Sequence, residues 1–225
     1  MEASIGGFPR AADWDYAFRL VTLGLLTKAK CTARGILLLL DNNLVGDAQV
    51  LLRTLLELTI ILLYIARAPE RRALLYFNFQ HITPWLLKQR LGSYPREAVA
   101  ISTMAPDFDQ TVEANYHNHK GPYLDKKGNP RRTWSLHPLR EMAQEVNLRD
   151  LCDLMYPIDS GLVHSGPDGL QNYVAQADDG RLEILPQLPA RRFMRILGDT
   201  ANCLGRVTRC AAGIFDRKEV LGALD

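Results

Sequence analysis

The stretch VLLRTLLELTIILLYIA, residues 50–66, decides the fold of this 225-residue chain. Thirteen of its 17 residues are apolar, so a helix formed here needs burial along most of its surface. The two charged residues, Arg53 and Glu57, stand four apart and therefore share one helical face. Each charge would cost about 3 kcal/mol at the centre of a bilayer. We therefore predict a buried core helix rather than a membrane span.

Helical periodicity and turn signals extend in both directions from this helix. We predict further elements as follows: helices over residues 14–40, 44–67, 70–90 with a break or kink at Pro84, and 96–117; a helix capped by Ser135 and stapled by Trp134; a short helix from Asp150 that restarts at Pro157; an extended piece at 182–185; and a helix over 190–221. The predicted fold class is all-α. We expect a single-domain bundle of about six to eight helices, with a projecting polar loop near residues 117–133 and a long C-terminal helix.

Composition restricts the function only weakly. The net charge of +2 gives no overall electrostatic case for nucleic acid or an anionic membrane. The four cysteines are scattered, and no Gly-rich phosphate loop or dinucleotide fingerprint is present, so we predict no cofactor and no metal. The first twelve residues lack the apolar run of a secretory signal, and we expect a cytoplasmic protein.

The Arg53 and Glu57 pair admits two interpretations. A charge left unpaired in a protein interior costs several kcal/mol, so each side chain must meet the other or a group from another helix. The pair can serve only to fix helix register, or it can belong to a functional site. The best partner for such a site is His164, because Tyr156, Ser160 and His164 are spaced four apart and can line one helical face.

Three short motifs carry a family resemblance: LLRTLLEL at residues 51–58, TWS with LREMA at 133–135 and 139–143, and Tyr156 followed by DSGLVHSG at 159–166. Over about residues 44–173 the chain resembles an uncharacterised bacterial helical family catalogued as domain of unknown function 5677. It has a distant look of HEPN-type helical ribonucleases and toxins. In those, an arginine and a histidine four to six residues apart cleave RNA without a metal.

This sequence departs from the HEPN pattern. The residues five to seven before His164 are Asp159, Ile158 and Pro157, so the arginine would come from another helix as Arg53. The resemblance then implies a catalytic set made of His164, Arg53, Glu57, Ser160 and Tyr156. A histidine near neutral pKa can move the substrate protons, while an arginine stabilises the phosphate charge.

Two basic segments are candidates for RNA binding. One is a stripe along the last helix, and the other is the loop near residues 117–133, which is flanked by Tyr116, Tyr123 and Trp134. The predicted contacts are Arg191, Arg195, Arg206 and Arg209 in the stripe, and Lys126, Lys127, Arg131 and Arg132 in the loop. Both segments are equally typical of solvated surface. We assign no metal site to the run His117, Asn118 and His119, whose side chains point apart.

Three functions remain open. The first is a metal-independent ribonuclease or toxin of bacterial defence, with RNA as substrate and a protein antitoxin as a further partner. The second is a non-catalytic binding or assembly module in which the Arg, Glu and His network is structural. The third is a small-molecule pocket in which Arg53 clamps a carboxylate or phosphate. A seam of small residues, Gly198, Ala201, Gly205 and Ala212, would let another helix approach closely, either within the bundle or from a second subunit, and we expect a homo-oligomer formed through a helix face.

Overall fold

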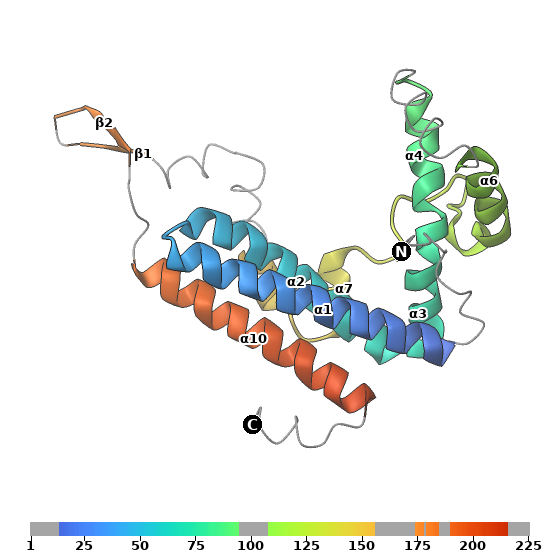
Figure 1. The fold of residues 1–225 in the computed structure, drawn as a ribbon, viewed down its shortest axis with the longest axis horizontal. Helices are drawn as coiled ribbons and strands as arrows, with labels where there is room; N and C mark the ends of the chain where they lie inside the picture. The colour runs from blue at the N-terminus through green and yellow to red at the C-terminus, as the bar shows by residue number, and fades with distance from the viewer. Residues whose placement is uncertain (1–13, 95–107, 156–173, 178, 185–189, 216–225) are drawn as a thin grey trace, which may run out of the picture. The chain divides into compact units, whose positions relative to one another are not determined.

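A computed structural model describes residues 14–94, 108–155, 174–177, 179–184 and 190–215 (Figure 1). Most of them are helical, in α1 (Trp14–Asp41), α2 (Val45–Arg67), α3 (Pro69–Asn78), α4 (Thr83–Leu91), α6 (Phe108–His119), α7 (Leu139–Glu145) and α10 (Ala190–Ile214), with short 3-10 turns η1 (Phe79–His81) and η2 (Gly121–Tyr123). Residues 149–155 are also helical. The all-α prediction is confirmed.

A short antiparallel hairpin joins β1 (Val174–Gln176) to β2 (Leu182–Ile184), with Ala175 opposite Glu183. Its second strand falls within the extended piece predicted at residues 182–185. Tertiary contacts divide the chain into two compact units: Met1–Val21 with Ala68–Leu136, and Thr22–Arg67 with His137–Asp225. We call them the first and the second unit.

In the second unit α1 and α2 form an antiparallel hairpin. Asn43 adopts a left-handed conformation with φ of 58°. The N–H of Asn43 donates to the Leu40 carbonyl and that of Leu44 to the Leu39 carbonyl, at 3.0 and 2.8 Å. These bonds end α1 in a Schellman arrangement. Next to the turn the two helices pack closely, since a Cβ on Gly35 would lie 3.0 Å from the Leu51 Cδ1.

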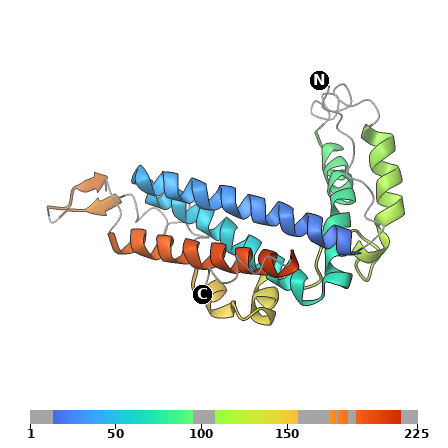
Figure 2. The same ribbon diagram turned by 60° about the horizontal axis from the view of Figure 1, so that its bottom comes forward.

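The long helix α10 packs along α2, and Figures 1 and 2 show α1, α2 and α10 side by side. Buried residues on α10 recur at helical spacing, as expected for one apolar stripe: Ile196, Thr200, Cys203, Val207 and Ala211. On α2, Leu52, Leu55, Leu56, Ile60 and Leu62 are fully buried. The core of the second unit is therefore built around α2.

Among the described residues, α2 is the one helix long and apolar enough to cross a membrane. However, 61% of its most apolar stretch is buried inside the structure. Core helices of folded domains share this length and composition. The absence of a membrane span therefore stays a prediction, as does the cytoplasmic location.

The first unit has its own small core. Ile82, Tyr116 and Tyr123 are buried together, with Phe79 and Trp85 packed against them. The predicted break at Pro84 falls slightly earlier, at η1, and Pro84 instead occupies the first turn of α4. Proline is tolerated there because the first helical N–H groups have no intrahelical partner.

The polar loop predicted at residues 117–133 is shorter and more firmly attached than expected. Helix α6 continues to His119, and Tyr123 is buried, with its hydroxyl donating to the Leu75 carbonyl at 2.8 Å. Beyond it the Asp125 carboxylate accepts the N–H groups of Lys127 and Asn129, both at 2.8 Å. These bonds hold the exposed residues 126–129 in a tight turn.

Ser135 does not cap a helix, so this prediction is wrong. Helix α7 begins at Leu139, directly after Pro138. A proline disfavours the helical conformation in the residue before it, here His137, and therefore prevents a helix from starting at Ser135. Trp134 does not staple the helix either; it packs edge-on against Tyr76, with ring centroids 5.1 Å apart. Predictions for residues 96–107, for a restart at Pro157 and for 216–221 lie outside the described residues.

The burial of α2 gives a direct test of this core. Leu55→Ala should lower the free energy of unfolding by about 2 to 5 kcal/mol, because it leaves a cavity where Leu55 is fully buried. Chemical denaturation measures the loss. The matched control is Leu38→Ala on α1, where the side chain is 54% exposed and the change should stay within about 0.5 kcal/mol. Equal losses in both variants would contradict the packing described.

Candidate functional site

A polar face runs along the otherwise apolar helix α2. Gln49, Arg53, Glu57 and Tyr64 lie within a sector of about 80° at about 100° per residue. The Arg53 Nε donates to the Glu57 Oε1 at 3.3 Å, and the two side chains are 14% and 36% exposed. The arginine is thus largely shielded from water, whereas the carboxylate remains partly open.

The same face makes more interactions than the ion pair alone. Gln49 lies one turn before Arg53 and is almost fully buried, at 1% exposed. Gln49 and Arg53 each have a further interaction partner. The pair therefore belongs to a larger polar network on α2, which a simple surface ion pair would not need.

The chain from His137 to Met155 covers this face, as the packing of α7 on α2 shows. The Tyr64 ring meets the His137 ring edge-on at 6.3 Å, and the His137 Nδ1 lies 2.8 Å from the Glu141 carboxylate. Burial raises the pKa of the Cys152 thiol, and the Glu57 carboxylate is among the charges that raise it further. Glu57 therefore lies near the helical residues 149–155.

Two arginines converge on one carboxylate beside this face. The Arg140 Nε and Nη2 donate to Asp153 at 2.7 and 2.9 Å, and the Arg149 Nε donates to it at 3.3 Å. The Arg140 hydrogen bond, aided by Arg149, lowers the pKa of Asp153 to about 2. Because two guanidinium groups share one carboxylate, the cluster keeps a net positive charge.

The other predicted catalytic residues, Tyr156, Ser160 and His164, lie outside the described residues. The helical stretch before them is described as far as Met155, which is buried. Tyr156 is thus the next residue after the segment that covers Glu57. Sequence reasoning had missed Gln49, Tyr64, His137 and Cys152. The spacing of four from Gln49 to Arg53 could have indicated the first of them.

The predicted basic stripe lies on α10. Arg195 and Arg209 are exposed, and the Arg206 Nε donates to the Asn202 side chain at 2.9 Å. The side chain of Arg191 is outside the described residues. Asp199, one turn after Arg195, is half-buried, and its burial raises the pKa of its carboxyl group. Arg195 and Arg209 of the stripe therefore lie at the surface.

The predicted basic loop belongs to the first unit. Lys126, Lys127 and Arg132 are exposed, whereas the Arg131 Nη2 donates to the Pro122 carbonyl at 2.6 Å. The aromatic residues that flank this loop are engaged within the first unit. Tyr116 and Tyr123 are buried in the core of the first unit, and Trp134 packs edge-on against Tyr76.

The small-residue seam on α10 is only partly covered. A Cβ added to Gly198 or Gly205 would meet nothing within 4 Å in the described part of the chain. Ala201 is exposed, whereas Ala212 is buried. The helix packing predicted for this seam therefore does not occur at Gly198 and Gly205 within the described residues.

Over the residues that the structure describes, no three His, Cys, Asp or Glu side chains gather in a way that could hold a metal ion. The four cysteines are free; Cys152 and Cys203 are buried, whereas Cys31 is exposed. Burial raises the pKa of Cys203 and Cys210 to about 11, so neither thiol is an activated nucleophile.

The lowered pKa of Asp153 predicts a pH effect on stability. A carboxyl group with a depressed folded-state pKa stabilises the fold above its unfolded pKa, near 3.8, and loses this contribution as pH falls towards about 2. Asp153→Asn should therefore flatten the fall in melting temperature between these two pH values. The shift should be small because the pair is exposed. Unchanged pH dependence in the variant would contradict the assignment.

Comparison with known proteins gives a family. No curated protein matches the chain, and no solved structure does. A family model described as a family of unknown function, DUF5677, matches residues 19–181. The match contains residues 44–173, over which the motifs gave the resemblance, and extends beyond them at both ends. Since it covers more than half of the sequence, the chain belongs to the DUF5677 family.

Proposed function

We propose that this protein is a metal-independent ribonuclease whose site lies on the polar face of α2. The observation that carries the proposal is the Arg53 and Glu57 pair, held at 3.3 Å on a core helix with the arginine largely buried. A partly buried guanidinium interacts with a phosphate more strongly than an exposed one, because water screens it less. The segment carrying His164 follows directly after the helical residues that lie near Glu57.

Each residue has a chemical role in this proposal. His164 moves the proton of the 2′-hydroxyl or of the leaving oxygen, and Arg53 stabilises the charge on the phosphate. Glu57 orients Arg53 through the hydrogen bond between their side chains. Ser160 and Tyr156 would hold the histidine ring in one tautomer.

The basic residues would bind the rest of the RNA. On α10 these are Arg191, Arg195, Arg206 and Arg209, and in the loop Lys126, Lys127, Arg131 and Arg132. Contacts to phosphates carry no base specificity, so the proposal is for RNA of broad sequence. The resemblance to HEPN-type toxins adds a role in bacterial defence in the cytoplasm, with an antitoxin as protein partner and a homo-oligomer as the assembled form.

A non-catalytic binding or assembly module is the second candidate. The observation that favours it is that Arg53 already interacts with Glu57 and with a further partner, which suits a lock on helix register. The uncovered glycines of α10 also suit a helix face that meets another chain. In this alternative the polar network only fixes how the helices pack.

Cleavage of a labelled single-stranded RNA in the presence of a chelator tests the ribonuclease proposal. His164→Ala should lower the rate by about 100-fold or more, the usual contribution of an acid–base group. Arg53→Lys should also lower it, because lysine keeps the charge but loses the planar fork.

The matched control for the arginine is Arg90→Ala, an exposed arginine at the end of α4, which should cleave at the normal rate. Circular dichroism establishes that each variant is folded. Full activity in both His164→Ala and Arg53→Ala, or no cleavage by the intact protein, would exclude the proposed site. Harmless expression together with tight oligomerisation would favour the second candidate.

A further inference from the structure

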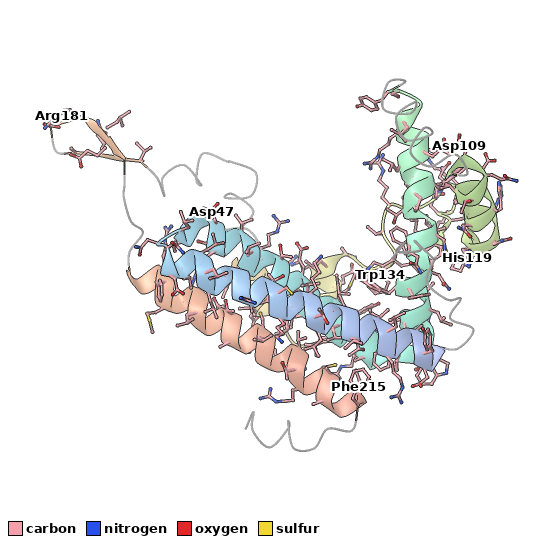
Figure 3. The ribbon with its side chains drawn as sticks, viewed as in Figure 1. Asp47, Asp109, His119, Trp134, Arg181 and Phe215 are labelled. Atoms are coloured by element: carbon pink, nitrogen blue, oxygen red, sulfur yellow. The ribbon has the colours of Figure 1, made fainter. Side chains whose placement is uncertain are left out.

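Helix α1 carries leucines that stay about half exposed in the second unit. Leu23, Leu37 and Leu38 are 53%, 45% and 54% exposed, and Leu44, in the turn between α1 and α2, is 48% exposed. Figure 3 shows α1 in front of α2, with side chains drawn as sticks. Single exposed leucines are common on protein surfaces, but several on one helix indicate a surface that contacts something else.

Two basic side chains lie between these leucines. At about 100° per residue, five side chains fall within a sector of about 100° and so share one side of the helix: Leu23, Lys30, Arg34, Leu37 and Leu38. We call this side the outer α1 face. Lys30 and Arg34 are exposed like the leucines. The face therefore has apolar side chains at its two ends and cations in its middle.

The protein does not neutralise the cations of the outer α1 face. Neither Lys30 nor Arg34 makes an ion pair with another residue that the structure describes. The sequence has no acidic residue from position 16 to position 40. The next one is Asp41, the last residue of α1. The middle of the face therefore keeps its positive charge, although the whole chain has a net charge of only +2.

The combination of cations and leucines distinguishes between possible partners. The phosphates of RNA would pair with the cations but would leave the leucines in water. A second copy of the chain would bring further cations to the contact, and like charges close together repel each other. At an anionic membrane, leucines enter the acyl boundary while long basic side chains reach the headgroup phosphates. Only this last partner suits both kinds of residue.

We propose that the outer α1 face binds the surface of an anionic membrane, with α1 lying in the plane of the interface. Leu23, Leu37 and Leu38 enter the apolar boundary, and Lys30 and Arg34 contact the phosphates of the lipid headgroups. The contact is peripheral and needs no helix to cross the bilayer. This inference goes beyond the proposed ribonuclease function and uses no residue of the polar face of α2.

Co-sedimentation of the full-length chain with lipid vesicles tests the proposal. Vesicles made of equal parts phosphatidylglycerol and phosphatidylcholine should bind the protein, and vesicles of phosphatidylcholine alone should bind it at least about 10-fold more weakly. Raising the salt concentration from about 0.1 M to about 0.5 M should weaken binding to the mixed vesicles, because salt screens the charge of the headgroups.

Substitutions on the face should weaken binding without unfolding the protein. Lys30→Ala and Arg34→Ala should each lower the affinity for the mixed vesicles about fivefold, the usual contribution of a basic residue near an anionic membrane. Leu38→Ala should lower it about fourfold or more, because it removes methylene groups from the lipid. Leu38 is half exposed, so this variant should unfold at nearly the same denaturant concentration as the intact chain.

The matched control is Lys28→Ala, which removes an exposed lysine of the same helix at about 160° from Lys30. Its side chain points away from the proposed contact, so the affinity should change by less than about twofold. A loss in this control as large as that in Lys30→Ala would overturn the proposed orientation of α1 and with it the inference.

Three further outcomes would overturn the inference. The first is equal binding to both kinds of vesicle, or binding to neither. The second is loss of vesicle binding in Arg195→Ala but not in Lys30→Ala, which would place the lipid on α10. The third is a chain that leaves the vesicles unbound and self-associates in a way that Leu38→Ala abolishes, which would make the face a contact between two copies.

Discussion

The requirement to bury α2 on most of its surface governs the second unit. A helix with apolar residues around nearly its whole circumference cannot lie on a surface, so other elements must cover it. The hairpin turn at Asn43 brings α1 onto one side, α10 lies along another, and the chain from His137 to Met155 covers a third. The positions of these elements follow from the composition of a single helix.

Within that arrangement, the polar face of α2 is the part of the helix that carries groups able to bind a ligand or transfer a proton. A core that only had to be stable would be simpler with apolar residues at Gln49, Arg53 and Glu57, because a buried ion pair is rarely better than good apolar packing. The segment that packs near this face is itself polar, with His137 against Tyr64 and an ion pair between Arg140 and Asp153. Selection for a function, or for one unique register, accounts for its presence.

The sequence predicted the long helices well because each of them carries a strong periodic signal. The bounds of α1 and α2 differ from the predictions by one residue. The prediction of a helix cap at Ser135 was wrong because it considered the local cap signal without the restriction that Pro138 imposes on the residue before it. The role of Tyr123 was missed because a tyrosine in a polar loop gives no sign that a distant carbonyl, that of Leu75, will accept its hydroxyl. For the site, spacing placed Arg53 beside Glu57, but the contact of Tyr64 with His137 is a tertiary contact without a local sequence pattern.

The packing of α10 on α2 also sets an order of events during synthesis. Helix α2 is complete at Arg67, but the helix that covers it begins only at Ala190. Until the ribosome has made the whole intervening chain, the α10-facing leucines of α2 stay open to water or to a chaperone. Three glycines, at positions 198, 205 and 213, weaken the intrinsic helix propensity of α10. Before α10 emerges, these leucines of α2 are therefore an apolar surface through which the nascent second unit can aggregate.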